Sequence, residues 1–358
     1  MKFGYFTLSD NAYPNNPRTA SQFVREIREQ AVLAETLGFH SAWVGEHHFD
    51  TLGVNSRPDL VLTSVAAVTE RIRLAPAVSV LPLHHPIHVA ECWATLDVLS
   101  EGRVDFACGR GYDSREYEAF NAEFMASAEI FEECMDIIWK AWTSDGPWSH
   151  VGARHTIKDM AITPKPVQNP IPFYVASFSE TSAEMAAKRG HNIVFAPFAA
   201  GMVFGGLGSA VTTYRKKCEA NGNTPGRAIC SYFIHIANSA EEEDRAREAQ
   251  MSYFKHCVLP AFPNDPDKAP PTMQYFMKIV DILKNMGKED LTDKSILLGP
   301  PAQIIDTLKR VEAAGIDEVI LYFNVGNKPH EVVIEQMGRF AEEIAPAFAD
   351  LGLRTNAR

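Results

Sequence analysis

Short apolar segments rich in β-forming residues alternate with segments of helical spacing along almost the whole chain, and this alternation constrains the fold most. The first pair is a strand at 3–6 and a helix whose apolar residues recur every three or four positions between Phe23 and Leu37. Further strands are predicted at 41–45, 72–81, 104–108, 173–176, 192–195, 229–236 and 318–322. Helical spacing at 89–99 and 124–142 separates some of these strands, so the chain is built from repeated β–α units.

Eight strands that are each almost continuously apolar predict a parallel sheet covered on its outside by helices. A single (β/α)₈ TIM barrel over residues 1–358 fits this order best, because that fold accommodates such a length as one domain. The alternative is a doubly wound open sheet. It would carry a Gly-x-Gly-x-x-Gly turn after the first strand, whereas residues 7–13 contain no glycine.

Two segments interrupt the alternation of strands and helices, and we expect them to be insertions in the barrel. Residues 147–172 predict a small hairpin followed by an extended segment. Residues 257–295 contain five prolines and are too long for an ordinary connection, so we expect them to form a lid over the barrel.

Composition and charge restrict the class of protein. Hydrophobic residues make up 46% of the chain and charged residues 22%, which is enough for a large folded core. The net charge of −11 has the wrong sign for a nucleic-acid binder. The six cysteines are widely spaced and predict reduced thiols, while no apolar run reaches the length of a membrane span. We therefore expect a cytoplasmic protein that contacts neither nucleic acid nor membrane.

In a TIM barrel the catalytic residues lie where the strands end, so polar residues at those points are candidates. Four predicted strands end in such residues, and we expect their side chains to share one rim. In chain order they are Glu46-His47-His48-Phe49; His84, His85 and His88; Gly109-Arg110-Gly111-Tyr112; and Ser177-Phe178-Ser179-Glu180-Thr181-Ser182.

One hypothesis for this rim is a metal site, because histidine and glutamate are common metal ligands. Adjacent residues of a regular strand face opposite ways, so His47 and His48 cannot both ligate one ion. The His-x-His pattern of barrel hydrolases is also absent. We therefore expect no catalytic metal and interpret His84, His85 and His88 as core or capping residues, an interpretation that stays open for His47 and His48.

The fifth strand end predicts an anion site. Its hydroxyl residues precede a helix that runs from Ala183 to Arg189, and a helix N-terminus binds anions through its free N–H groups. Ser and Thr also cap helices without any ligand, so this stretch alone leaves both interpretations open. Arg110 between two glycines favours a phosphate, because the cation can make two hydrogen bonds while the backbone approaches closely.

Taken together, these residues resemble the bacterial luciferase-like flavin monooxygenases, and most closely the luciferase α-type chain. The similarity runs in order along nearly the whole chain and is weakest between 200 and 295. It rests on Met1-Lys2-Phe3-Gly4, Glu46-His47-His48-Phe49, Val80-Leu81-Pro82, His85-Pro86, Ala90-Glu91, Leu96-Asp97, Ser100, Gly102-Arg103, Arg110-Gly111 and Ala314-Gly315-Ile316-Asp317.

The resemblance implies a TIM barrel that uses reduced flavin mononucleotide (FMN) and O₂. In such enzymes a flavin hydroperoxide oxygenates the substrate, here expected to be small and largely apolar. A separate NAD(P)H:flavin reductase usually supplies the reduced flavin. The resemblance also implies pairing through outer helices of the barrel, so we expect a homodimer.

Residue by residue, the resemblance implies that His47 is a general acid or base, with Glu46 and His48 beside it. Ala77 and Val78 match a pair beside the flavin ring that a cis peptide bond often joins. The positions that bind the flavin phosphate match Arg110, Ser179 and Ser182. The expected flavin-binding set is completed by Gly111, Tyr112, Ser177 and Thr181.

Three departures separate this chain from the luciferase α-type pattern. Phe178 replaces a carboxylate beside the phosphate, and Ala128 replaces an arginine, so the phosphate site becomes less polar. The position of the reactive cysteine is Gly109, while Cys108, one residue earlier, faces the other way. Light emission is therefore not implied.

Two alternatives remain within the same architecture: a deazaflavin-dependent hydride-transfer enzyme, and a non-catalytic subunit like the luciferase β-type chain. His47 and the predicted lid argue against the second alternative, because a non-catalytic subunit needs neither a general acid or base nor a lid. Aromatic and methionine residues suggest an apolar substrate pocket, although each is more often simple packing: Phe49, Tyr112, Trp148, Phe198, Tyr275, Phe276 and Met277.

Overall fold

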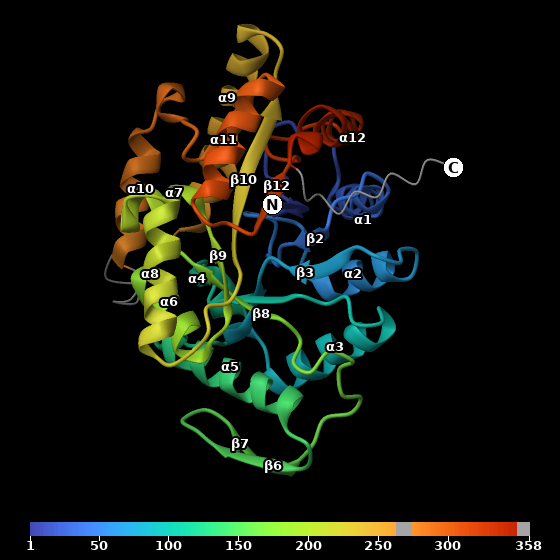
Figure 1. Cartoon of the computed structure of the whole chain (residues 1–358), viewed down its shortest axis with the longest axis vertical. Coiled ribbons are helices and arrows are strands. Elements are labelled where there is room, and N and C mark those ends of the chain that lie inside the picture. Colours follow the sequence, from blue (N-terminus) through green and yellow to red (C-terminus); the bar gives the residue numbers. More distant parts are fainter. Residues whose placement is uncertain (263–273, 349–358) are drawn as a thin grey trace.

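The computed structural model describes residues 1–262 and 274–348, and the side chains of all of these except 274–277. Its main sheet contains ten strands, shown with the surrounding helices in Figure 1. The strands are β1 (Lys2–Thr7), β2 (Ser41–Val44), β3 (Arg73–Pro76), β4 (Ser79–Val80), β5 (Phe106–Gly109), β8 (Phe173–Ser177), β9 (Asn192–Phe195), β10 (Ala228–Ile236), β11 (Ile296–Gly299) and β12 (Glu318–Tyr322).

All pairings in this sheet are parallel, in the order β3-β2-β1-β12-β10-β9-β8-β5-β4. The two ends of that order, β3 and β4, are consecutive parts of one strand. Leu74 of β3 also bridges Val104 just before β5, so the sheet forms a nearly closed barrel. The predicted TIM barrel is confirmed.

Helices follow most strands and cover the outside of the barrel (Figure 1). None of the described helices is both long and apolar enough to cross a membrane. The helices are α1 (Ala20–Thr36), α2 (Pro58–Ala66), α3 (Pro86–Leu99), α4 (Ser114–Ala119), α5 (Ser127–Thr143), α6 (Glu180–Arg189), α7 (Pro197–Phe204), α8 (Leu207–Ala220), α9 (Ala240–Tyr253), α10 (Gln274–Asn285), α11 (Pro301–Ala313) and α12 (His330–Arg339).

The structure differs from the predicted strands in two places. The segment 72–81 is divided into β3 and β4, with a cis peptide bond between Ala77 and Val78. Strand β11 was not predicted, because its four residues directly follow the segment interpreted as a lid. It pairs with Phe233–Ile236 at the end of β10, and the last three of these residues lie beyond the pairing with β12.

The two irregular segments contain ordered elements. Residues 147–172 include the antiparallel hairpin of β6 (Trp148–Val151) and β7 (Thr156–Met160), which lies beside α5 (Figure 1). After α9, the chain makes a π-helical turn at Phe254–Val258 and a short 3₁₀ turn at Leu259–Ala261, and α10 follows later. Residues 263–273 of the predicted lid lie outside the described residues.

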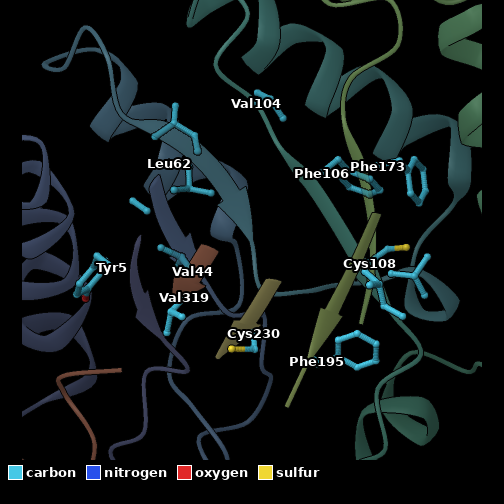
Figure 2. Close-up of a cluster of buried hydrophobic side chains, with 14 of the residues drawn as sticks. Tyr5, Val44, Leu62, Val104, Phe106, Cys108, Phe173, Phe195, Cys230 and Val319 are labelled. Atoms are coloured by element: carbon cyan, nitrogen blue, oxygen red, sulfur yellow. The ribbon is translucent and has the colours of Figure 1, made fainter. Parts of the chain in front are cut away.

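Alternation along the strands divides the core into two layers. Tyr5, Val44 and Val319 pack between the strands and the outer helices, in the cluster that Figure 2 shows. Their neighbours in sequence, including Phe6 and Trp43, pack inside the barrel. This division follows from the opposite directions of adjacent side chains in a strand. All six cysteines are unpaired and five are buried, in agreement with the prediction of reduced thiols.

The N-terminal end of the barrel interior is closed by a hydrogen-bonded ion pair. Glu318 is fully buried and accepts hydrogen bonds from Ser41 Oγ and from Arg227 Nη2, the second at 2.6 Å. Arg227 also donates to the Tyr174 hydroxyl at 2.8 Å. Trp43, whose indole N–H donates to Ser41 at 2.7 Å, lies in the apolar layer above. This apolar layer separates the ion pair from the other end of the barrel.

Candidate functional site

A cavity of about 290 Å³ opens at the C-terminal end of the barrel. Its wall is formed by the residues that follow β1, β2, β3, β5, β8 and β9, together with residues of the segment between β10 and β11. Most of these residues are apolar, and eleven of the described ones are aromatic. The aromatic residues are Phe6, Trp43, Tyr112, Phe131, Phe178, Phe195, Phe198, Phe233, Tyr253, Phe254 and Phe262.

Nine of the twelve predicted site residues line this cavity: Glu46, His47, Ala77, Val78, Arg110, Gly111, Tyr112, Thr181 and Ser182. The other three, His48, Ser177 and Ser179, lie behind this first layer. The hydroxyls of Ser177 and Ser179 lie 3.1 Å and 3.0 Å from Ser182 Oγ. The structure therefore brings residues from four strand ends into one site.

His47 contributes a ring nitrogen without a partner. Its Nε2 atom is buried and makes no hydrogen bond within the described part of the chain, although the ring lies on the cavity wall. Burial lowers the pKa of His47 to about 4, and the opposing effect of the Glu46 charge is smaller. The ring is consequently neutral near pH 7 and can accept a proton.

Glu46 organises the loop around His47. Its Oε2 atom accepts the Val80 N–H at 3.0 Å, and its Oε1 atom pairs with His48 Nε2 at 3.2 Å and with His84 Nε2. Burial raises the pKa of Glu46, but the hydrogen bonds from His48 and His84 outweigh it and lower the pKa to about 2. Burial lowers the pKa of His84, but the hydrogen bond to Glu46 and the Glu46 charge together outweigh burial and raise that pKa above its ordinary value.

Three residues of the metal hypothesis, Glu46, His48 and His84, lie together. Ligand atoms of Glu46, His48 and His84 lie within 4.8 Å of one another, but hydrogen bonds to each other and to the backbone already occupy the Glu46 oxygens. His47 lies on the cavity wall instead. His84 is largely buried and pairs with Glu46, which is compatible with its interpretation as a core residue. His85 does cap α3 by accepting the Ile87 N–H, and His88 is exposed.

The predicted anion site lies at the start of α6. Ser179 is the N-cap, and its hydroxyl and that of Ser182 each accept a backbone N–H of the other residue at 3.2 Å. The first N–H groups of a helix have no partner within it, so this turn can bind an anion. Thr181 and Ser182 face the same cavity as Arg110. The backbone carbonyl of Arg110 accepts the Tyr117 hydroxyl, which anchors this strand end.

Two glycines beside Arg110 allow close packing of the cavity wall. A Cβ atom at Gly109 would lie 2.6 Å from Val78 Cγ2, and one at Gly111 would lie 2.7 Å from Val80 Cγ1. Gly111 also has a φ of +69°, which favours glycine. Cys108 packs in the outer core, while Gly109 faces the cavity, as the alternation predicted.

The sequence prediction missed two charged residues of the wall, Asp113 and Glu116, and misplaced two aromatic residues. Glu116, which lines the cavity, lies on the short helix α4, and nothing in the local pattern distinguishes it from the exposed Glu118. Phe49 is 60% exposed and Trp148 packs in the outer core, so neither lines the pocket as suggested. Tyr112 and Phe198 do line it. The side chains of Tyr275, Phe276 and Met277 lie outside those described.

Comparison with known sequences identifies related proteins over the whole length. A family described as luciferase-like monooxygenase matches residues 1–318. A flavin-dependent trigonelline monooxygenase oxygenase component from Acinetobacter baylyi is 25% identical over 98% of this chain and 96% of its own. An alkanal monooxygenase beta chain from Photorhabdus luminescens is 27% identical over 74% of this chain and 80% of its own.

Solved structures support the barrel fold. Monooxygenase RslO1 from Streptomyces bottropensis superposes with a TM-score of 0.81 at 24% identity, covering 98% of this chain and all of that one. An F420-dependent secondary alcohol dehydrogenase, solved with an F420-acetone adduct, superposes with a TM-score of 0.72 at 20% identity, covering 97% and 98% of the two chains. At these identities the similarity establishes the fold alone.

Proposed function

Because the chain belongs to the luciferase-like monooxygenase family, we propose that it is a monooxygenase that uses reduced FMN and O₂ to oxygenate a small, largely apolar organic substrate. The observation that carries this proposal is the cavity itself. It combines an unpartnered His47 nitrogen with Arg110 and the α6 N-terminus on one apolar wall. In this proposal residues 1–358 act as one domain, with insertions at about 147–172 and 257–295.

The residues present fit a flavin. Arg110, Thr181, Ser182 and the first turn of α6 would hold the phosphate, with Ser177 and Ser179 supporting them from behind. The ring would lie against Ala77, Val78, Gly111 and Tyr112. Gly109 and Gly111 have no side chain that would narrow this part of the cavity. Reduced FMN, when bound, supplies the two electrons that activate O₂.

The roles of the chain's own residues follow from their surroundings. His47 is neutral and would accept a proton from the substrate, then return it. Glu46 and His48 act as positioning residues, because they hold the loop that carries His47. Val258, Phe262 and Leu283, from the segment over the barrel mouth, exclude water from this part of the cavity.

The proposal is tested by adding O₂ to the protein loaded with reduced FMN in the presence of candidate substrates. We expect a product that carries one oxygen atom from ¹⁸O₂, measured by mass spectrometry. A parallel titration with reduced deazaflavin separates the main alternative, since tight binding of that cofactor alone would exclude FMN. Activation of a second chain, with no product from this one, would instead indicate a non-catalytic subunit.

Reduced flavin has to be supplied, and we propose a separate NAD(P)H:flavin reductase as the partner in the cytoplasm. The trigonelline enzyme is named as an oxygenase component, which supports a division of labour between two proteins. Reduced FMN prepared chemically should therefore replace the reductase in the assay described above.

Replacing Arg110 with alanine is expected to weaken FMN binding by roughly 10- to 100-fold, because a hydrogen bond to a charged group contributes about 1.5–3 kcal/mol. Quenching of flavin fluorescence measures the dissociation constant. Riboflavin, which lacks the phosphate, is the control ligand and should bind both proteins equally. An equal loss for riboflavin and FMN would assign Arg110 to the ring or to folding.

We also propose a homodimer that pairs through α2 and α3, which pack against each other on the outside of the barrel. Leu60 on α2 and Leu99 at the end of α3 are 63% and 62% exposed. Light scattering should give twice the 39.7 kDa of one chain. Replacing both leucines with aspartate should produce monomers, whereas Val151→Asp, at another exposed apolar position, should not. A monomeric unaltered protein would refute the proposal.

A further inference from the structure

The cavity wall contains a buried carboxyl group, Glu116, for which the proposed chemistry has no use. Its residue is only 3% exposed, yet the side chain lines the cavity. Oε1 accepts the backbone N–H of His48 at 2.9 Å. Oε2 makes no hydrogen bond to any described residue, and no described lysine or arginine forms an ion pair with this carboxyl.

The other two acidic groups of the wall are already neutralised. Glu46 pairs with His84 and His48, as described above. Asp113, the N-cap of α4, pairs with Arg115, whose Nε donates to it at 2.9 Å. Glu116 is consequently the carboxyl of the described wall that lacks a cation. The charged and titratable groups around it are His48, Glu46, Asp113, the Arg115 that is paired with Asp113, and the tyrosines Tyr112 and Tyr117.

The surroundings of Glu116 disfavour its charged form. Burial raises the pKa of Glu116 to about 7, and the negative charges of Asp113 and Glu46 add to the rise, while the His48 N–H opposes it. A neutral, apolar ligand would leave this largely buried carboxyl without a partner. A ligand that brings a positive charge would satisfy Oε2 and restore the carboxylate.

Aromatic rings near the same cavity favour the same kind of ligand. Trp43, Tyr112, Phe178, Phe198 and Tyr253 are all part of the wall. The face of an aromatic ring attracts a cation, most strongly where water is excluded. An apolar, aromatic wall with one unpaired carboxyl matches an apolar molecule that carries one positive nitrogen.

We propose that the substrate cavity selects organic cations, namely protonated amines or cationic nitrogen heterocycles, whose nitrogen pairs with Glu116 Oε2. The binding of such a cation is argued from the cavity alone. Only the statement that the bound cation is the substrate rests on the proposed function. Arg110 does not oppose it, because the flavin phosphate would take that charge at the α6 end of the cavity. Glu116 is thus the residue that determines specificity.

Calorimetric titration of the protein loaded with oxidised FMN tests the proposal with two probes of similar size. Benzylamine carries a positive charge at pH 8, and benzyl alcohol carries none. We expect benzylamine to bind at least about 10-fold more tightly, which corresponds to one hydrogen bond between charged groups. Equal or tighter binding of the alcohol overturns the proposal.

The variant Glu116→Gln separates charge from structure. Glutamine keeps an oxygen that can accept the His48 N–H, so the loop should be preserved. We expect the preference for benzylamine to disappear while the affinities for benzyl alcohol and FMN stay the same. Glu118→Gln, the same change at an exposed position of the same helix, should keep the preference. If Glu116→Gln weakens FMN binding and leaves the preference intact, the carboxyl serves the flavin and the proposal fails.

The pH dependence provides an independent readout. Benzylamine stays protonated between pH 5 and 8, whereas Glu116 loses its charge as the pH falls through about 7. The preference should therefore shrink at pH 5 in the unaltered protein and be absent at every pH in Glu116→Gln. These measurements need no turnover. Failure of the oxygenation assay would refute the proposed function and leave the cation site standing, and the reverse also holds.

Discussion

His47→Ala is expected to lower turnover by ~10²-fold or more, because a positioned acid or base contributes about that factor to a proton transfer. Its Nε2 atom is the buried ring nitrogen of the cavity that has no partner among the described residues. The affinity for FMN should change little, since Arg110 and the start of α6 are untouched. The rate of product formation at saturating substrate measures the effect.

The pH profile gives the same prediction a second check. His47 acts as a base only in its neutral form, and its pKa is lowered to about 4 by burial. Activity that depends on this base should therefore persist well below pH 6.5 and fall only as the pH approaches 4. His85→Ala, which removes an exposed helix cap outside the cavity, is the matched control. Normal turnover by His47→Ala would remove this residue from the mechanism.

Glu318→Ala should produce the largest loss of stability, about 3 kcal/mol or more, because it leaves Arg227 without its carboxylate at the closed end of the barrel. Ser41 would lose an acceptor at the same time. The shift of the urea unfolding midpoint, combined with the slope of the transition, measures the change in the free energy of unfolding.

The paired replacement distinguishes this explanation from a simple loss of packing. Changing Arg227 and Glu318 together to methionine removes both charges, so much of the stability should return. The apolar layer of Trp43 separates this end from the cavity, so FMN affinity of the folded protein should be preserved. A loss below about 1 kcal/mol in Glu318→Ala would show that the buried pair contributes little.

The fold was largely predictable because the period of the apolar pattern reports local geometry. The strands at 41–45, 192–195 and 318–322 were found nearly at their final bounds, since each is an apolar run between polar turns. Strand β11 was not found, because its four residues follow a proline-rich stretch and are paired only through the unusually long β10. The pairing of distant strands does not change the local spacing of apolar residues, so the sequence pattern does not reveal it.

The position of a site residue was predictable where it depends only on which end of a parallel strand the residue follows. Parallel strands place their ends at one rim, so chain order alone groups Glu46, Arg110 and Ser182. Ala77 was expected only from the family resemblance. The hydrogen-bond partners of these residues, which lie behind the rim, could not be predicted. His84 pairs with Glu46 across 38 positions, and Glu116 meets the His48 backbone across 68, by contacts that depend on how α4 and the loops fold back.

By itself, the sequence determined the barrel, the family and the residues at the strand ends, because periodicity and chain order are properties of neighbouring positions. Only the tertiary structure decided the charge state of those residues. Burial keeps His47 neutral, the hydrogen bonds from His48 and His84 keep Glu46 ionised, and burial raises the pKa of Glu116 to about 7. Desolvation and electrostatic pairing depend on what surrounds a group in space, and that surrounding is assembled from distant parts of the chain.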